Sequence, residues 1–137
     1  MYEFHYELQV QVGHLNYGGR LGHDSVVRMV HEARVHMFHV LGVAENNLGD
    51  NRTGLIMGDL AFSYCGEGHL FDKVRLDSHV GEVRRSAFRL FHRLARDNTL
   101  IALVETGLMA YDYTLRAIAP FPEAFKRSLA EYLENPV

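Results

Sequence analysis

The stretch of residues 12–42 constrains the fold more than any other part of the chain. It opens with a glycine-rich loop and continues as an apolar segment without glycine or proline until Gly42. Apolar side chains recur there at intervals of three and four residues, which predicts one long helix that follows a cap at Asp24-Ser25 and runs to Leu41. The runs that follow alternate between apolar and polar residues, as strands do. A chain with one long apolar helix and several strands must cover that helix with a sheet.

The predicted helix has one broad apolar face and one narrow polar stripe. The apolar face consists of Val26, Met29, Val30, Ala33, Met37, Val40 and Leu41, and the stripe consists of Arg28, Glu32, His36 and His39. Because Val27, Val35 and Phe38 add apolar surface at the flanks, we expect the helix to be largely buried. A carboxylate such as Glu32 on a buried helix needs either a partner or a function.

Five strand-like runs accompany this helix. They are residues 2–12, 55–64, 70–83, 86–96 and 99–113, and a short amphipathic helix is predicted over residues 123–133. Short turns join the later strands and make neighbours antiparallel, and Asp97-Asn98 has the composition of a hairpin turn. We therefore predict a single α+β domain over residues 1–137, in which a twisted antiparallel sheet of about five strands wraps a long central helix. The run of residues 99–113 is apolar on both faces, which predicts a homodimer or homotetramer.

Charge and composition exclude several function classes. The formal net charge is −3 with histidine neutral, and the basic residues are scattered, which argues against nonspecific binding of nucleic acid. The charged, alternating first residues do not look like a targeting signal, and no apolar run approaches the ~20 residues of a membrane helix. The single cysteine, Cys65, cannot form an internal disulfide. We expect a cytoplasmic protein that acts away from membranes.

Three pieces of the sequence, spread over the chain, carry a family resemblance. They are the loop NYGGRLGHD, the helix piece HEAR and the later passage GEVRRSAFRLFHRLARDNTLIALVETG. Their order and spacing resemble the hotdog-fold acyl-CoA thioesterases, in particular the 4-hydroxybenzoyl-CoA thioesterase-like group. The resemblance implies the hotdog fold and hydrolysis of an acyl-CoA to a free acid and CoA. It implies no cofactor other than the CoA of the substrate.

The loop departs from the pattern of that group at its most important position. Members usually carry a catalytic aspartate just before the glycines, but here the matching residue is Asn16 and the earlier aspartate position is His14. A side-chain amide is not a base, although it can hold a water or a carbonyl by hydrogen bonds. Either another residue supplies the base, or the protein is a non-catalytic module that binds acyl-CoA or acyl-carrier protein. The motifs of hotdog dehydratases and hydratases are not found.

The resemblance and the chemistry of the residues together suggest a catalytic group. His23 matches a histidine at the helix start of related thioesterases, and Glu32 lies where other hotdog thioesterases place a catalytic carboxylate. We expect Asn16 and His23 to position water or the carbonyl, and Glu32 to act as the base, unless Glu32 only pairs with a neighbour on the helix. Backbone N–H groups from Gly18 and Gly19 onwards are expected to polarise the thioester carbonyl.

Other residues are expected to bind the substrate or to be structural. Arg84, Arg85 and Ser86 follow a glycine-containing turn and can grip CoA phosphates, or they form an exposed basic turn. Tyr17 and Asp59 complete the predicted substrate contacts, although Asp59 can equally partner a histidine or a backbone amide. No metal is expected, because H-E-A-R-V-H is one residue longer than the zinc-binding H-E-x-x-H spacing.

Overall fold

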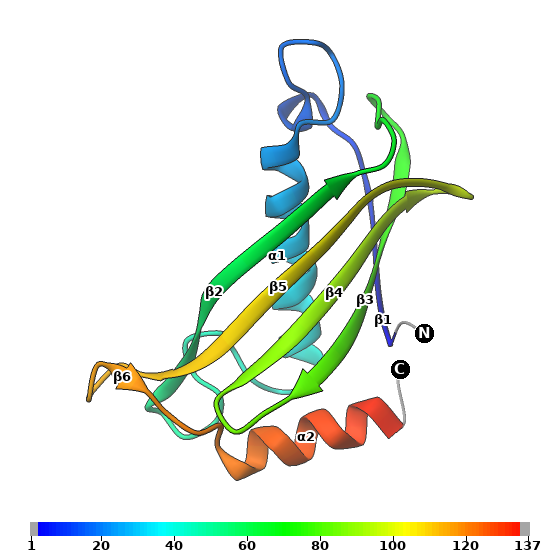
Figure 1. Ribbon diagram of the computed structural model, residues 1–137. Helices are drawn as coiled ribbons and strands as arrows, with labels where there is room; N and C mark the ends of the chain where they lie inside the picture. The colour runs from blue at the N-terminus through cyan, green and yellow to red at the C-terminus, as the bar shows by residue number, and fades with distance from the viewer. Residues whose placement is uncertain (1–2, 135–137) are drawn as a thin grey trace.

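The computed structural model describes residues 3–134, which form a six-stranded antiparallel sheet and two helices (Figure 1). The strands are β1 (Phe4–Gln9), β2 (Thr53–Tyr64), β3 (Lys73–Val83), β4 (Ala87–Arg96), β5 (Thr99–Asp112) and β6 (Ala117–Ile118). The helices are α1 (His23–Val40) and α2 (Glu123–Glu134), and a 3-10 turn, η1 (Val12–His14), precedes α1. Neither α1 nor α2 is long and apolar enough to cross a membrane.

The strands lie in the order β1-β3-β4-β5-β2, and β6 adds a short pairing to β5. The α+β class and the antiparallel sheet predicted from the sequence are confirmed. The boundaries differ by a few residues, and the first residue of the strand predicted over 2–12 lies outside the described residues. The turn after β4 contains Asp97 at a φ of 52°, the left-handed conformation that aspartate tolerates.

The sheet covers only one side of α1, so the prediction that this helix is largely buried is wrong. Apolar residues of the covered side are buried, namely Val26, Met29, Val30, Ala33, Met37 and Phe38. On the other side, the side chains of Glu32 and His36 are 54 % and 48 % exposed. The helical repeat explains this, because the polar stripe points away from the face that contacts the sheet.

An aromatic cluster joins α2 to the sheet and to α1. The rings of Phe38 and Phe125 lie 6.1 Å apart, and Phe121 lies 5.8 Å from Phe88 and 5.3 Å from Phe125. Tyr132 donates a hydrogen bond of 2.7 Å to the carbonyl oxygen of Glu3, ahead of β1. These contacts hold α2 across the lower end of the sheet in Figure 1.

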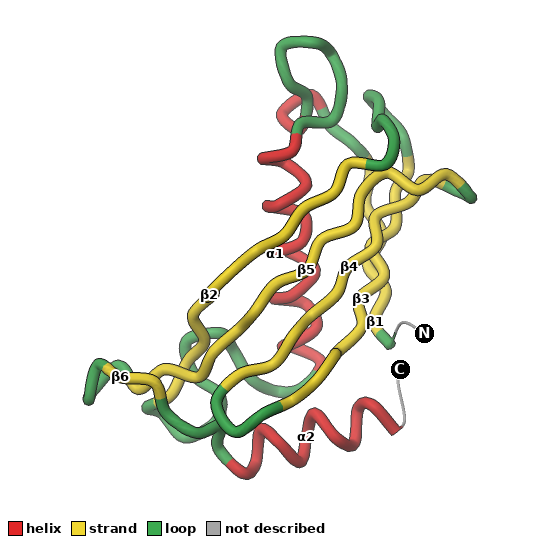
Figure 2. Tube along the Cα trace, in the orientation of Figure 1, coloured by secondary structure: helices red, strands yellow, loops and turns green. Residues whose placement is uncertain are grey.

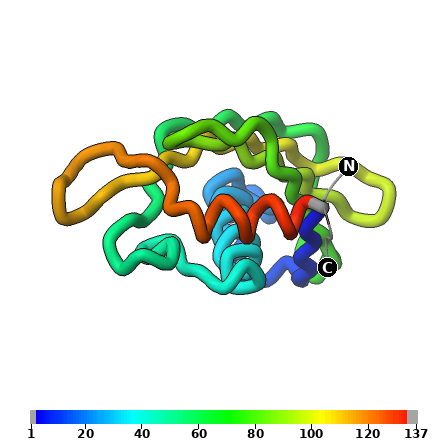
Figure 3. Tube along the Cα trace, turned by 90° about the horizontal axis from the view of Figure 1, so that it is seen from below, coloured from blue at the N-terminus to red at the C-terminus, as the bar shows by residue number. Residues whose placement is uncertain are grey.

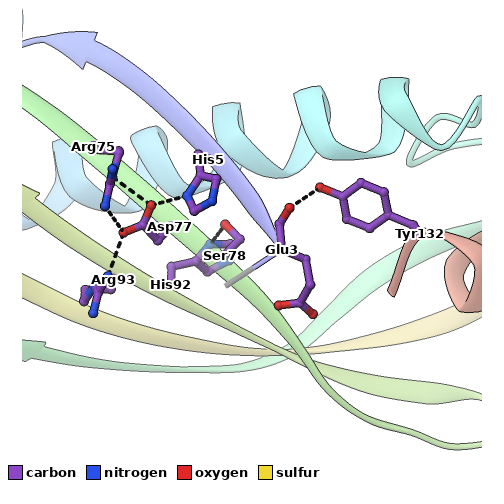
Figure 4. A network of polar contacts seen from close by, with 8 residues as sticks. All are labelled: Glu3, His5, Arg75, Asp77, Ser78, His92, Arg93 and Tyr132. Atoms are coloured by element: carbon purple, nitrogen blue, oxygen red, sulfur yellow. Dashed lines mark hydrogen bonds and ion pairs between the residues drawn. The ribbon is translucent and has the colours of Figure 1, made fainter. Parts of the chain in front are cut away.

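Polar side chains are buried in the part of the sheet made by β1, β3 and β4 (Figure 4). The carboxylate of Asp77 lies 2.5 Å from His5, 2.9 Å from Arg75 and 2.9 Å from Arg93. Burial alone would raise the pKa of Asp77, but the hydrogen bonds from His5 and Arg93 and the charge of Arg75 lower it overall.

His92 lies deeper, on the face of the sheet that packs against α1. Its Nδ1 lies 2.7 Å from the hydroxyl of Ser78, and its Nε2 has no hydrogen-bond partner among the described residues. Burial, together with the positive charge of Arg34, lowers the pKa of His92 from 6.5 to about 3. The imidazole is therefore neutral at physiological pH, and its protonation is coupled to unfolding.

Candidate active site

The glycine-rich loop is closed by its own backbone. The amide of Asn16 donates to the carbonyl oxygen of Arg20 at 2.8 Å, and the amide of Gly22 donates to that of His14 at 3.0 Å. The amide of Leu21 donates to the carbonyl oxygen of Gly68 at 2.8 Å, which ties the loop to the β2–β3 connection. Figure 2 shows both connections at the same end of the molecule, where α1 begins.

Asn16 stabilises this loop by hydrogen bonds to its side chain and to its backbone carbonyl. Its side-chain oxygen accepts hydrogen bonds from the amides of Gly18 at 2.9 Å and Arg20 at 3.2 Å, and its carbonyl oxygen accepts one from Gly19 at 3.0 Å. The N–H groups of Gly18 and Gly19, which the sequence suggested as oxyanion donors, are therefore already engaged. In this conformation, the hydrogen-bond donors for a substrate carbonyl must come from other residues.

The first turn of α1 supplies such donors. Gly22 is the N-cap and has no side chain to accept a hydrogen bond, and the first backbone bond of the helix runs from Val26 to Gly22. Within residues 3–134, the amides of His23, Asp24 and Ser25 have no acceptor. Together with the helix dipole, these N–H groups favour a negatively charged oxygen at this position.

A pocket of about 470 Å³ lies beside this helix start. It is lined by Asn16, Tyr17, Gly18, Arg20, Leu21, Tyr64, Gly66 and Glu67. The hydroxyl of Tyr64 donates to the carbonyl oxygen of Leu21, and Arg20 pairs with Glu67 at 2.7 Å across the rim. Burial and the negative charge of Asp24 raise the pKa of Tyr64, so Tyr64 is a hydrogen-bond donor here.

Asp24 is the carboxylate of the helix start. A Cβ atom placed on Gly22 would lie 2.6 Å from Asp24 Oδ1 and 3.5 Å from Asn16 Cβ, so these two side chains flank Gly22. Asp24 is exposed and contacts only Arg28, at 3.3 Å, among the side chains of the described chain. The sequence predicted a helix cap at Asp24-Ser25, which is wrong, because the N-cap is Gly22 and both residues lie in the first turn of α1. The sequence feature that could have pointed to a catalytic role was the position of Asp24 directly after the glycine-rich loop.

Glu32 lies eight residues further along, about 12 Å up the helix axis from Asp24. Its carboxylate lies 2.9 Å from His36, and the ring of His36 stacks on Tyr6 with 4.6 Å between centroids. Burial and the negative charge of Glu32 raise the pKa of Tyr6. The structure thus shows the helix pairing that the sequence left open, and within one chain neither Glu32 nor Asp24 is among the residues that line the pocket.

Asp59 lies on the face of the sheet that is turned away from α1. Its two carboxylate oxygens accept hydrogen bonds of 2.8 and 2.7 Å from Arg89, which also contacts Glu105 at 2.5 Å. The hydrogen bonds from Arg89 lower the pKa of Asp59. The partner of Asp59 is thus an arginine on β4, and neither a helix histidine nor a backbone amide.

Arg84, Arg85 and Ser86 lie in the turn between β3 and β4, at the end of the sheet opposite to the glycine-rich loop (Figure 1). Arg84 contacts Glu82 at 2.9 Å and lines a separate hollow of about 370 Å³ that also contains Asp59. Within one chain, these residues cannot contact a ligand that sits at the start of α1.

Neighbouring histidines of α1 hold different carboxylates. His31 lies 2.7 Å from Glu45, which also accepts a hydrogen bond from Arg34, whereas His36 lies beside Glu32. Across residues 3–134, no group of three or more histidine, cysteine, aspartate or glutamate side chains is placed to hold a metal ion.

Several solved structures share this fold. A 1,4-dihydroxy-2-naphthoyl-CoA thioesterase from Synechocystis is 18% identical, with a TM-score of 0.86, over 97% of this chain and 98% of that one. The hypothetical protein SAV2348 from Staphylococcus aureus, solved in complex with CoA, is 18% identical, with a TM-score of 0.89, over 98% of this chain and 85% of that one. The gentisyl-coenzyme A thioesterase BH1999 is 18% identical, with a TM-score of 0.80, over 90% and 98% of the two chains.

Sequence comparison places the chain within a family. No curated protein sequence matches it. The profile of the thioesterase-like superfamily, however, matches residues 10–129, which include the loop, both helix starts and the whole β2–β5 sheet. The chain therefore belongs to the thioesterase-like superfamily, which confirms the family recognised from the sequence, and the solved structures share its fold.

Proposed function

We propose that the protein hydrolyses an acyl-CoA thioester to a free acid and CoA. The observation that carries this proposal is the start of α1, where three free amides and the carboxylate of Asp24 directly follow the loop that lines a pocket. Membership of the thioesterase-like superfamily supports the reaction class. The structure with CoA bound in the Staphylococcus aureus protein supports a CoA-type ligand.

The reaction requires an oxyanion site and a base. In our proposal, the thioester oxygen accepts hydrogen bonds from the amides of His23, Asp24 and Ser25 as it becomes negatively charged. Asp24 removes a proton from a water that attacks the carbonyl carbon. The C–S bond then breaks, the sulfur leaves as the thiol of CoA after protonation, and the acid is released. The side-chain N–H₂ of Asn16 and the imidazole of His23 position the water or the carbonyl.

Glu32 remains the alternative base suggested by the sequence. A ligand that extends along α1 could reach Glu32. Glu32 lies about 12 Å from Asp24 along the helix, however, and is therefore separated from the free amides of its own chain. Since Asp24 lies beside those amides, we propose Asp24 first and Glu32 second.

The CoA part of the substrate requires basic groups that the pocket alone does not provide. Arg84, Arg85 and Ser86 lie at the far end of their own chain, so we propose that they serve the pocket of a second subunit in a homo-oligomer. The cytoplasmic location expected from the composition remains a prediction.

A non-catalytic acyl-CoA or acyl-carrier-protein binding module is the second candidate. Asn16 favours it, because this amide stands where the related thioesterases have an aspartate and here stabilises the loop. Such a module would bind the ester at the same helix start and would not cleave it.

Release of free thiol from a panel of aliphatic and aromatic acyl-CoAs separates these two functions. We expect at least one ester to be cleaved well above its spontaneous rate, with heat-denatured protein as the control. Tight binding of several esters without release of thiol from any of them would favour the binding module.

A further inference from the structure

Tyr64, the last residue of β2, connects the sheet to the residue that precedes the N-cap of α1. Its hydroxyl donates a hydrogen bond to the backbone carbonyl oxygen of Leu21, although the side chain is 46 % exposed and water is an available partner. Leu21 is followed by Gly22, the N-cap, and then by the three amides that we propose as oxyanion donors. A contact at Leu21 therefore acts on the stretch of backbone that orients these amides.

The strand end that carries Tyr64 is held firmly. The amides of Cys65 and Gly66 both donate to the carbonyl oxygen of Ile101, at 2.8 and 3.0 Å, and fix the end of β2 against β5. The ring of Tyr64 contacts that of Phe62 edge to face, with 5.0 Å between the centroids. A hydroxyl supported in this way can fix the position of the carbonyl that accepts its hydrogen bond.

The β2–β3 connection holds Leu21 from a second side. The amide of Leu21 donates to the carbonyl oxygen of Gly68 at 2.8 Å, and the side chain of Leu21 is buried. A Cβ atom on Gly68 would lie 2.9 Å from both Cβ and Cδ2 of Leu21, so the close contact requires glycine. The N–H and the C=O of Leu21 are thus both bonded to the segment of residues 64–68.

Tyr64 also lies near the proposed base. Burial and the negative charge of Asp24 raise the pKa of Tyr64, which means that the phenol is close enough to the carboxylate to interact with it. The phenol therefore remains a hydrogen-bond donor at physiological pH. Tyr64 and Asn16 both line the pocket. One residue thus links the pocket wall, the carboxylate and the helix start.

We propose that Tyr64 is a positioning residue, whose hydroxyl holds the carbonyl of Leu21 and thereby orients the helix-start amides of residues 23–25 toward the oxygen of the ligand. Its effect on hydrolysis rests on the function proposed above, whereas its effect on the backbone of the helix start depends on no reaction. Oxyanion donors stabilise the transition state only at hydrogen-bonding distance, so a small displacement of these amides lowers kcat.

Tyr64→Phe tests this role, because it removes the hydroxyl and keeps the ring. We expect kcat for an acyl-CoA to fall about tenfold with little change in KM, since the pocket wall is retained while the amides lose their alignment. In the free protein, we expect the backbone amide NMR signals of residues 22–25 to shift. A hydroxyl that only stabilised the fold would lower the unfolding temperature without this selective fall in kcat.

Tyr113→Phe is the matched control. Tyr113 is 49 % exposed, and its hydroxyl donates to the carbonyl oxygen of Leu55 at 3.2 Å, so this variant loses the same kind of hydrogen bond near the other end of β2. Tyr113 belongs to the hairpin of residues 111–118, drawn in orange, which projects from one side of the molecule in Figure 3. We expect wild-type kinetics and unshifted signals for residues 22–25.

Gly68→Ala acts on Leu21 from the second side. The added methyl group has no room beside the buried Leu21, so the loop must move, and we expect kcat to fall at least as far as in Tyr64→Phe. Thermal unfolding of this variant shows whether the protein remains folded at the assay temperature.

Both effects of Tyr64→Phe are required. The absence of amide shifts at residues 22–25, or an unchanged kcat in an active enzyme, would overturn the proposal. A higher KM with constant kcat would make Tyr64 a ligand contact and would overturn it as well. If the wild type cleaves no ester, the proposed hydrolysis fails, and the amide shifts of Tyr64→Phe, compared with those of Tyr113→Phe, still decide whether Tyr64 positions the helix start.

Discussion

Substitution of Asp24 by asparagine is expected to lower kcat for acyl-CoA hydrolysis by at least about 100-fold, the range found for loss of a general base. The side chains are nearly isosteric, so the loop and the helix-start amides keep their positions. The exposed contact with Arg28 that is also lost contributes at most about 1 kcal/mol to stability. The measurement is thiol release at saturating substrate, with thermal unfolding of both proteins as a check of the fold.

Glu32→Gln is the matched control for this prediction. It removes a carboxylate of the same helix, but one that contacts His36 and lies about 12 Å along the axis. We expect its kcat to stay close to that of the wild type. The opposite pattern, with Glu32→Gln inactive and Asp24→Asn active, would reverse the assignment of the base and return it to the residue that the sequence suggested.

The second large effect concerns His92 and acid stability. The pKa of His92 is about 3 in the folded protein and 6.5 in the unfolded chain, so below pH 6.5 only the unfolded chain takes up a proton. The free energy of unfolding is therefore expected to fall by about 1.4 kcal/mol for each pH unit below this point. Denaturant titrations between pH 6.5 and about 5, which lies above the ordinary pKa values of aspartate and glutamate, isolate this contribution from most carboxylate titration.

The double variant Ser78→Ala/His92→Leu tests whether this pair causes the slope. Because both hydrogen-bonding partners are replaced together, no buried polar group is left without a partner. We expect a much flatter pH dependence, whereas His36→Gln, which changes a half-exposed histidine, should keep the wild-type slope. Equal slopes for the double variant and the wild type would show that His92 is not the group responsible.

The spacing of apolar residues predicted most helices and strands of this fold well, because most of them bury one continuous face. The strand predicted over residues 86–96 is observed as Ala87–Arg96, and the C-terminal helix starts at Glu123 as expected. Strand β6 was not predicted, because a strand of two residues is too short to show an alternating pattern. The exposure of α1 was also missed, because the sequence shows which residues are apolar but not that the sheet covers only one side of the helix.

The site was harder to predict than the fold. The loop and the helix start were located from the glycines, yet the use of the Gly18 and Gly19 amides by Asn16 depends on a loop geometry that the sequence does not specify. Asp24 was assigned to capping because aspartate is common at helix N-caps, but the structure places the cap at Gly22 and Asp24 in the first turn of α1. The separation of Arg84 from the pocket depends on the end of the sheet that the glycine-rich loop contacts, and only the structure shows that this loop bonds to the β2–β3 connection.

Backbone amide NMR is the most direct test of the central claim, that the start of α1 holds the carbonyl of a CoA ester. The probe is an acyl-CoA analogue in which a methylene group replaces the sulfur, so that the carbonyl remains but cannot be cleaved. We expect the largest shifts on binding at the amides of His23, Asp24 and Ser25, with small changes at Gly18 and Gly19. Saturable binding that leaves the three helix-start amides unshifted would contradict it.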